Sequence, residues 1–248
     1  MAQIDKQKEI VGMYKASFFF VLGTLFALLA YIFQNYDKLS DNKLILLNGV
    51  VLFGVFSLIF VVKRLKEKFS GKFIIGHIGA LDDKHKGQTI IINLAKSLQT
   101  KYPDILFLLL GTGDDEQYLK NLAKGLNNVV FEGFVHNVID YIAIFDIFLF
   151  PSRNEGLGST LLDVIEGEVC IVASDVGGIP DIITNDKTGI LFDINNQEKL
   201  EEIIISLYND KEKCQTLTLE AKKSIDKYSV ETMCKSYIDI YKNIINPT

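Results

Sequence analysis

Short apolar runs alternate with helix-length segments from residue 72 onward, and this alternation constrains the fold more than any other feature of the chain. Runs such as ILFLLL, IFLF and CIVAS have the length of strands and contain almost no polar residue that would mark a solvent-facing side. Strands buried on both faces are typical of parallel sheets that helices cover on each side. The pattern therefore predicts an α/β fold built on a parallel sheet with helices on both faces.

The loops that follow these runs contain glycine and would meet at one edge of the sheet. They read GALDDKHKGQ, GTGDDE, GFVHN, PSRNEGLGST and SDVGGIPD, and the last of them contains Gly177 and Gly178. Ligands of open α/β sheets bind beyond the carboxyl ends of the strands, and glycine lets backbone N–H groups approach them closely. The chain has no GxSxG elbow, no P-loop and no complete GxGxxG fingerprint, so hydrolase, ATPase and dehydrogenase sites are disfavoured.

Two long runs without charge precede this pattern, at residues 16–34 and 44–62. As helices they would each span about 28 Å at ~1.5 Å per residue, close to the hydrocarbon thickness of a bilayer. They predict an N-terminal two-helix transmembrane hairpin in a first domain of residues 1–69, followed by an α/β domain of residues 70–248. The alternatives are a buried helical hairpin of a soluble domain and a cleaved signal peptide. The first run begins late and lacks a small-residue cleavage site, which disfavours a signal peptide.

Basic residues near the ends of these runs indicate an orientation. Three lysines precede the first run and four basic residues follow the second, whereas the connecting loop contains two lysines. Because basic flanks stay on the cytoplasmic side, this distribution predicts a multi-pass protein of the inner membrane. Both termini and the α/β domain would be cytoplasmic.

The charge of the chain changes sign at the same boundary. Through Phe69 there are nine basic and five acidic residues, and the remainder contains 17 basic and 26 acidic residues. No nucleic-acid partner is expected, because phosphates require a basic surface. The cysteines and histidines lack the spacing of a disulfide framework or a zinc site, so structural or surface roles and no metal are expected. These residues are Cys170, Cys214, Cys234, His77, His85 and His136.

Five ordered blocks stand out between Phe73 and Tyr241: GALDDKHKG, LLLGTGDDEQYLKNLA, VVFEGFV, FPSRNEGLGSTLLDVIEGEVCIVASDVGGIPDII and TGILF. Together they resemble the C-terminal domain of group 1 retaining glycosyltransferases. That domain is the nucleotide-sugar-binding half of the GT-B fold, which has two Rossmann-like domains. The resemblance implies a single Rossmann-like C-terminal half of such a fold. It also implies a nucleotide-diphosphate sugar as the substrate and no cofactor.

The resemblance assigns roles to two carboxylates in the stretch EGLGSTLLD, Glu155 and Asp163. In that family the first acid contacts the hydroxyls of the donor sugar, and the second contacts the ribose of the nucleotide. A carboxylate suits either role because it accepts two or more hydrogen bonds. The alternative is that Glu155 is a solvated loop acid and Asp163 an ordinary surface residue of a helix.

The residues between these acids are expected to hold the diphosphate. The N–H groups of Ser159, Thr160 and Leu161 begin a helix, where donors lack intrahelical partners and the helix dipole favours an anion. Gly156 and Gly158 keep side chains away from that place. On the neighbouring loop GFVHN, Val135 matches a family position near the nucleobase.

Lys86 matches the family's lysine that binds the donor diphosphate, which implies that it stabilises the leaving group during catalysis. Glu155 is the second residue expected to act in catalysis. The family usually has an arginine after the glycine of its first strand, but here Gly79 is followed by Ala80. Either the site is weaker, or another cation replaces the arginine; the candidates are Lys84, His85 and a residue of a partner. Lys86 could otherwise be an ordinary solvated lysine.

The family's acceptor-binding N-terminal domain has no counterpart in this sequence, which has the two apolar runs instead. Three interpretations follow. The chain is a membrane-anchored glycosyltransferase acting on a lipid-linked or surface-glycan acceptor, completed by another chain or by self-association. Otherwise it is a nucleotide-sugar-binding module without activity, or a structural remnant of a truncated or fused enzyme. The final segment SVETMCKSYIDIYKNII resembles the family's last helix, and its apolar face would need a cover.

Overall fold

The structure is a computed structural model, and it describes residues 60–245. The chain divides into two units, Met1–Leu65 and Lys66–Thr248, and the features described below belong to the second. The predicted membrane spans at 16–34 and 44–62 lie outside the described residues, except for 60–62, which are part of a helical stretch that ends at residue 68. Among the helices that are described, none combines the length and the apolar character needed to cross a bilayer.

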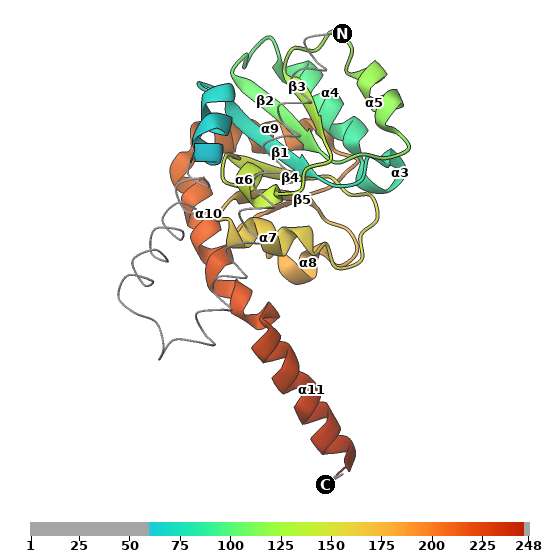
Figure 1. Ribbon diagram of the computed structural model, residues 1–248, viewed down its shortest axis with the longest axis vertical. Helices are drawn as coiled ribbons and strands as arrows, with labels where there is room; N and C mark the ends of the chain where they lie inside the picture. The colour runs from blue at the N-terminus through green and yellow to red at the C-terminus, as the bar shows by residue number, and fades with distance from the viewer. Residues whose placement is uncertain (1–59, 246–248) are drawn as a thin grey trace, which may run out of the picture. The chain divides into compact units, whose positions relative to one another are not determined.

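Six parallel strands form one sheet in the order β3-β2-β1-β4-β5-β6 (Figure 1). The strands are β1 (Phe73–Ile78), β2 (Ile105–Leu110), β3 (Val129–Gly133), β4 (Ile147–Phe150), β5 (Cys170–Ser174) and β6 (Ile190–Phe192). The predicted α/β fold with a parallel sheet is confirmed. The strand order reverses between β1 and β4, and in open α/β sheets such a switch point is where ligands bind.

The strands differ in burial. β2, β4 and β5 are buried at every position, as the apolar runs predict. β3, whose stretch VVFEG contains a glutamate, is only partly buried along its whole length. The reason is its place at the edge of the sheet, where β2 is its one neighbouring strand.

Helices cover both faces of the sheet. They are α3 (Asp83–Lys86), α4 (Gln88–Leu98), α5 (Glu116–Leu122), α6 (Val138–Ile142), α7 (Thr160–Glu166), α8 (Ile179–Ile182), α9 (Gln197–Asn209), α10 (Lys211–Ser224), the 3-10 helix η2 (Ile225–Tyr228) and α11 (Val230–Ile245).

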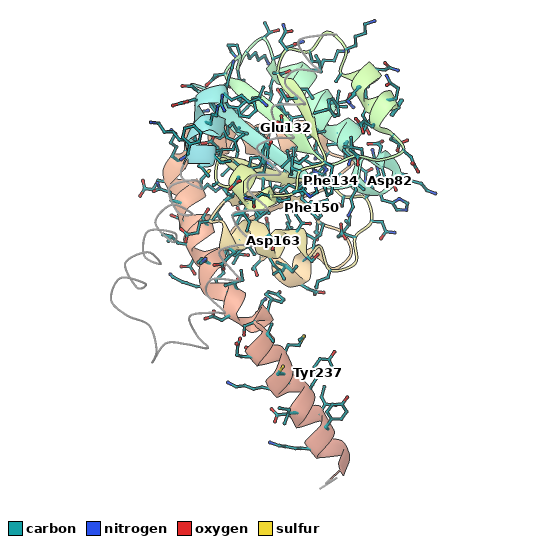
Figure 2. The ribbon with its side chains drawn as sticks, in the orientation of Figure 1. Asp82, Glu132, Phe134, Phe150, Asp163 and Tyr237 are labelled. Carbon is teal, nitrogen blue, oxygen red and sulfur yellow. The ribbon has the colours of Figure 1, made fainter. Side chains whose placement is uncertain are left out.

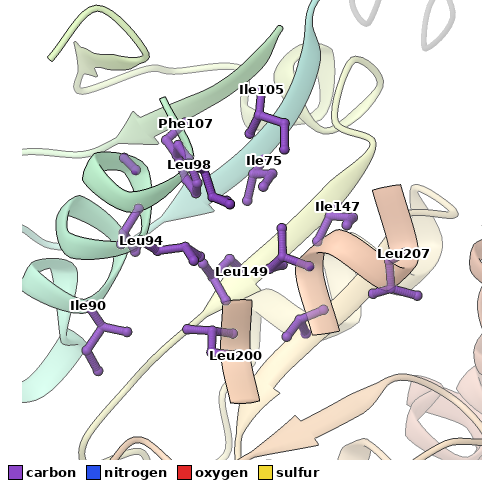
Figure 3. Close-up of a cluster of buried hydrophobic side chains, with 14 of the residues drawn as sticks. Ile75, Ile90, Leu94, Leu98, Ile105, Phe107, Ile147, Leu149, Leu200 and Leu207 are labelled. Carbon is purple, nitrogen blue, oxygen red and sulfur yellow. The ribbon is translucent and has the colours of Figure 1, made fainter. Parts of the chain in front are cut away.

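The main core lies between one face of the sheet and the helices α4 and α9. Leu94 and Leu98 of α4 and Leu200 of α9 pack against strand residues such as Ile75 and Leu149 (Figure 3). All five side chains are almost fully buried. Because successive strand residues point to opposite faces, this core uses every second residue of each strand.

The other face of the sheet carries α6 and α7. α7 packs against β5, and Gly167 at its end lies so close to α6 that a Cβ there would be 2.3 Å from Ile142. Phe145, Phe148 and Phe150 stack along this face, with ring centroids 6.4 Å and 5.8 Å apart. This aromatic column ends below the loop that follows β4.

The C-terminal helices complete the domain. α10 packs against β5, α7 and α9. α11 then projects away from the α/β body (Figure 1), and its large apolar side chains are half exposed or more. These side chains are Val230, Met233, Tyr237, Ile238, Ile240 and Tyr241. They include every residue of the apolar face that the sequence predicted.

Candidate functional site

The two loops that flank the switch point bring Lys86 and Glu155 together. Lys86 ends α3 after β1, and Glu155 lies on the loop after β4. Lys86 Nζ donates to Glu155 Oε2 at 2.5 Å, and Ser152 Oγ lies 3.3 Å from the same oxygen. The side chains of Lys86 and Glu155 are 24% and 14% exposed, so the ion pair is partly withdrawn from water.

A tight turn fixes Lys86 in this place. The Asp82 side chain accepts from the His85 N–H and caps α3, and the N–H of Gly87 bonds the Asp83 carbonyl to end it. Gly87 has a φ of +67°, and a Cβ at this residue would lie 2.2 Å from the carbonyl oxygen of Pro151. Only glycine satisfies both conditions. The α3 turn is therefore packed directly on the loop after β4.

Further contacts hold these two loops in register. The N–H of Arg153 donates to the His85 carbonyl at 2.7 Å, and the Arg153 side chain reaches Asp83 O and Thr89 Oγ1, each at 3.3 Å. Thr89 in turn binds the Asp83 carboxylate through its N–H at 2.6 Å. The distance between Lys86 and Glu155 is thus set by backbone and side-chain contacts on either side of it.

A buried polar pair lies beneath Lys86. His77 Nδ1 is 3.1 Å from the Leu149 carbonyl, and its Nε2 is 3.3 Å from Gln88 Nε2. Burial, the largest effect, and the nearby charge of Lys86 together lower the pKa of His77 from 6.5 to about 4, against the opposing effect of the Leu149 carbonyl. His77 is therefore neutral at physiological pH and adds no charge to the site.

Gln88 also binds Ala80, the residue at the position where the family usually has an arginine. Its Nε2 donates to the Ala80 carbonyl at 2.7 Å, while its Oε1 is buried without a partner in the described part of the chain. Ala80 itself is exposed, so a longer side chain would have room. Of the proposed substitutes, His85 is bound to Asp82 at 2.7 Å, and Lys84 is exposed.

The glycine loop after β5 packs against the loop that carries Glu155. Gly177 has a φ of +55°, and a Cβ there would lie 1.9 Å from the Glu155 carbonyl oxygen. At Gly178 a Cβ would lie 2.0 Å from the Gly156 carbonyl oxygen. The two glycines allow the backbone of the loop after β5 to pack closely against the backbone at Glu155 and Gly156, which helps to position Glu155.

The start of α7 partly matches the predicted arrangement. The N–H groups of Ser159 and Thr160 have no hydrogen-bond partner in the described chain, but the N–H of Leu161 donates to the Gly158 carbonyl at 2.8 Å. Two of the three predicted donors are therefore available. Gly158 has a φ of +70°, and Gly156 has open space around it.

Asp163 lies in the first turn of α7 and is exposed (Figure 2). No described side chain binds its carboxylate. It therefore stays a candidate for contact with a ligand, as the sequence predicts.

The loop after β3 differs from the prediction. Val135 is 9% exposed, so its side chain is turned into the protein, whereas the preceding Phe134 is 60% exposed. The Phe134 ring meets the His136 ring edge to face, with the ring centroids 5.0 Å apart. Any contact of Val135 with a ligand would have to use its backbone.

Several residues at the site were missed by sequence reasoning. Ser152 contacts Glu155, and the Phe150 ring lies 5.5 Å from Lys86 Nζ. Both belong to the stretch FPSRNEG, so their position next to Glu155 in the sequence was the available signal. Gln88 belongs to the loop GALDDKHKGQ and follows Lys86 by two residues, so it had the same kind of signal. His77 had none, because only the fold brings it below Lys86. Within residues 60–245, no group of three or more His, Cys, Asp and Glu side chains could hold a metal ion.

Sequence comparison identifies relatives of this domain. The model of a family described as glycosyl transferases group 1 matches residues 61–224. The N-acetyl-alpha-D-glucosaminyl L-malate synthase of Bacillus anthracis is 27% identical over 190 residues, which cover 73% of this chain and 49% of that protein. The capsular polysaccharide biosynthesis glycosyltransferase CapM of Staphylococcus aureus is 25% identical over 191 residues, which cover 73% of this chain and 50% of CapM. The chain spans about half the length of these relatives.

Solved structures share the fold. The structure of Anabaena HepE in complex with UDP and glucose has a TM-score of 0.66 at 22% identity, covering 74% of this chain and 52% of HepE. The C-terminal domain of the group 1 family protein LpcC from Francisella tularensis has a TM-score of 0.61 at 24% identity, covering 67% of this chain and 91% of that domain. The described unit thus shares its fold with most of that solved C-terminal domain.

Proposed function

Because this chain belongs to the group 1 glycosyl transferases, we propose that its α/β unit binds a nucleotide-diphosphate sugar and presents the sugar for transfer. The observation that carries the proposal is the ion pair between Lys86 and Glu155 at the switch point of the sheet. It places one cation and one hydrogen-bond acceptor where open α/β sheets bind ligands. A diphosphate requires the first of these groups, and sugar hydroxyls require the second.

Each group has a proposed role. Lys86 and the N–H groups of Ser159 and Thr160 would bind the diphosphate, Glu155 the sugar hydroxyls, and Asp163 the ribose. Transfer breaks the bond between the sugar carbon and a diphosphate oxygen. Lys86 would stabilise the negative charge that develops on that oxygen, because it lies in a partly desolvated place where charges interact strongly.

Ligand binding would change the partner of Lys86. In the structure its ammonium group is held by Glu155. When the diphosphate binds Lys86, Glu155 is released to accept hydrogen bonds from the sugar. The two residues would then act in catalysis as one unit, with the sugar between the carboxylate and the leaving group.

The acceptor would be bound by a second domain that faces the proposed donor site. We propose that another chain or another copy supplies it. Two apolar runs without charge, residues 16–34 and 44–62, precede the α/β unit. These runs would anchor the protein in the inner membrane with both termini in the cytoplasm. A lipid-linked or surface-glycan acceptor would suit that location.

The topology can be tested with single cysteines. In a variant in which the three native cysteines are replaced by serine, Ser40→Cys should react with an impermeant thiol reagent in intact cells. Ser70→Cys, which is exposed in the structure, should react only after the cells are opened. Labelling of Ser70→Cys in intact cells would place the α/β unit outside, away from cytoplasmic nucleotide sugars, and would contradict the proposal.

A second candidate function is a nucleotide-sugar-binding module without transferase activity. It is favoured by Ala80, which stands where the family usually has an arginine that would assist Lys86. The two candidates differ in turnover. Release of nucleoside diphosphate in the presence of membranes that contain the acceptor indicates a transferase, whereas binding without release indicates the module.

Titration with UDP and GDP tests the binding that both candidates share. Lys86→Ala should weaken the preferred nucleotide by about 1.5 to 3 kcal/mol, the range for a hydrogen bond to a charged group. Lys96→Ala, which removes an exposed lysine of α4, is the matched control and should bind normally. If Lys86→Ala and Lys96→Ala bound the nucleotide with equal affinity, Lys86 would not be part of the binding site. Absence of binding by the unaltered protein would contradict the proposed function.

A further inference from the structure

Two cysteines from different elements lie at the end of the sheet opposite to the proposed donor site. Cys170 is the first residue of β5, and Cys214 lies one turn into α10, which packs against β5. Both line one cavity of about 410 Å³ at the amino-terminal edge of the sheet. Cys170 is 3% exposed, whereas Cys214 is half-buried, so Cys214 is the more accessible of the two residues.

The two sulfur atoms have different environments. The Cys214 thiol lies 3.5 Å from the Leu207 carbonyl at the end of α9, and Cys214 packs against the same hydrophobic core that contains Cys170. One basic side chain, Lys211, and two acidic ones, Asp146 and Glu168, also line the cavity. Apolar side chains such as Phe73 and Phe145 form another part of that wall.

The interaction between the thiols makes them chemically unequal. Hydrogen bonding with the Cys170 side chain is the largest effect on the pKa of the Cys214 thiol and lowers it; the charge of Lys213 acts in the same direction, whereas burial and the charges of Asp210 and Asp146 oppose it. The same interaction, together with burial, raises the pKa of the Cys170 thiol. Cys214 is thus the more accessible residue as well as the one whose thiol pKa is lowered, which favours it as the nucleophile and the buried Cys170 as its protonated partner.

We propose that Cys170 and Cys214 form a peroxide-reactive pair that closes to a reversible disulfide between β5 and α10. The oxidant is a hydroperoxide such as hydrogen peroxide. The Cys214 thiolate attacks a peroxide oxygen, so that an S–O bond forms, the O–O bond breaks and hydroxide leaves as water after protonation. Cys170 then attacks the Cys214 sulfur, the S–S bond forms, and the S–O bond breaks. The leaving hydroxide takes the Cys170 proton and becomes a second water.

The disulfide would have a mechanical consequence. It would join β5 to α10, a helix that also packs against α7, where Asp163 lies. A cross-link between positions far apart in the sequence restricts the unfolded chain and raises stability. Such a transient bond is compatible with a reducing compartment, where disulfides are mostly redox-sensing rather than structural.

Peroxide treatment of the full-length protein tests the pair. Cys234→Ser removes the exposed cysteine of α11 and leaves only the pair. We expect one equivalent of hydrogen peroxide to consume both thiols, to link the peptides that contain Cys170 and Cys214, and to raise the melting temperature by several degrees. Dithiothreitol should reverse all three changes. Two free thiols after treatment, or a disulfide between two protein molecules, would overturn the proposal.

Single variants in the Cys234→Ser background test the roles of the two sulfurs. Cys170→Ala should leave Cys214 as a sulfenic acid that a 1,3-dione reagent traps. Cys214→Ser should protect Cys170 from peroxide, because the remaining thiol is buried. If Cys170→Ala does not fold, as judged by circular dichroism, the Cys214→Ser result decides alone. Rapid oxidation of Cys170 in that variant would show that Cys214 is not the reactive thiol and would contradict the mechanism.

Discussion

Lys86 and Glu155 neutralise each other across the switch point of the sheet, with Lys86 Nζ 2.5 Å from Glu155 Oε2. The pair joins the α3 turn after β1 to the loop after β4. Between them in the sequence lie α4, β2, α5, β3, α6 and β4. While the pair is closed, the ammonium group that should bind a diphosphate is occupied by a carboxylate of the same chain. Glu155 is therefore both a proposed sugar ligand and a competitor of the diphosphate.

Glu155→Gln should separate these two effects. We expect nucleoside diphosphate to bind at least as tightly as in the unaltered protein, because Lys86 loses its internal partner. The complete nucleotide sugar should bind about tenfold or more weakly than in the unaltered protein, since a glutamine amide replaces one of two acceptor oxygens by a donor. Isothermal titration with both ligands measures the difference. Equal loss for both ligands would show that Glu155 does not act on the sugar.

Asp163→Asn should weaken nucleoside diphosphate and nucleotide sugar to the same extent, because both ligands contain the ribose. The expected loss is on the order of tenfold, the effect of one charge-assisted hydrogen bond. Glu202→Gln on α9 removes another exposed carboxylate and is the control, for which binding should not change. If the two variants bound both ligands equally well, Asp163 would be an ordinary surface residue of α7.

Ala80→Arg should strengthen the binding of nucleoside diphosphate by about 1.5 to 3 kcal/mol, because it supplies the second cation that the family usually has. Ala80 is exposed and its carbonyl is held by Gln88, so the new side chain has room and a fixed starting point. Ala80→Gln adds a similar length without charge and should have little effect. A gain of the same size from both variants would mean that the charge is not the cause.

His77 should make stability dependent on pH. Its pKa is lowered from 6.5 to about 4 by burial, so the unfolded chain binds a proton in this range that the folded chain does not. The free energy of unfolding should therefore fall as the pH is lowered from about 6.5 to about 4. The loss due to this residue is about 2 to 3 kcal/mol between pH 7.5 and 4.5.

Urea denaturation of the protein and of His77→Gln at both pH values measures this contribution. The variant keeps a donor for the Leu149 carbonyl but cannot titrate. Its loss of stability between the two pH values should be smaller by the stated amount, with the remaining loss due to carboxylates. If both proteins lost the same free energy of unfolding between the two pH values, the pKa of His77 in the folded protein would not be lowered.

Gly177→Ala should destabilise the loop that carries Glu155. A side chain at a φ of +55° costs about 1 to 2 kcal/mol, and a Cβ placed 1.9 Å from the Glu155 carbonyl oxygen forces the backbone to move. The melting temperature and nucleotide-sugar affinity should both decrease. Gly156→Ala is the control for stability, because a Cβ there meets nothing within 4 Å. Unchanged melting of Gly177→Ala would indicate that the two loops are not packed as described.

The sequence by itself determined the α/β fold, the parallel sheet and the loops that carry the site. This was possible because each of these features is local. Continuous apolar runs such as residues 105–110 require burial on both faces, and the run of residues from Glu155 to Asp163 places its glycines, its acids and the start of α7 in one loop and helix. The same local reading could not detect that β3 is an edge strand, because its neighbours come from distant parts of the chain.

The tertiary structure decided how these pieces meet. The strand order places the loops after β1 and β4 side by side, so that Lys86 meets Glu155, and it places His77 and Gln88 beneath them. It also turned the Val135 side chain inward. Such relations depend on long-range strand pairing and on the packing of helices against the sheet, and side-chain contacts between segments far apart in sequence have no counterpart in local periodicity.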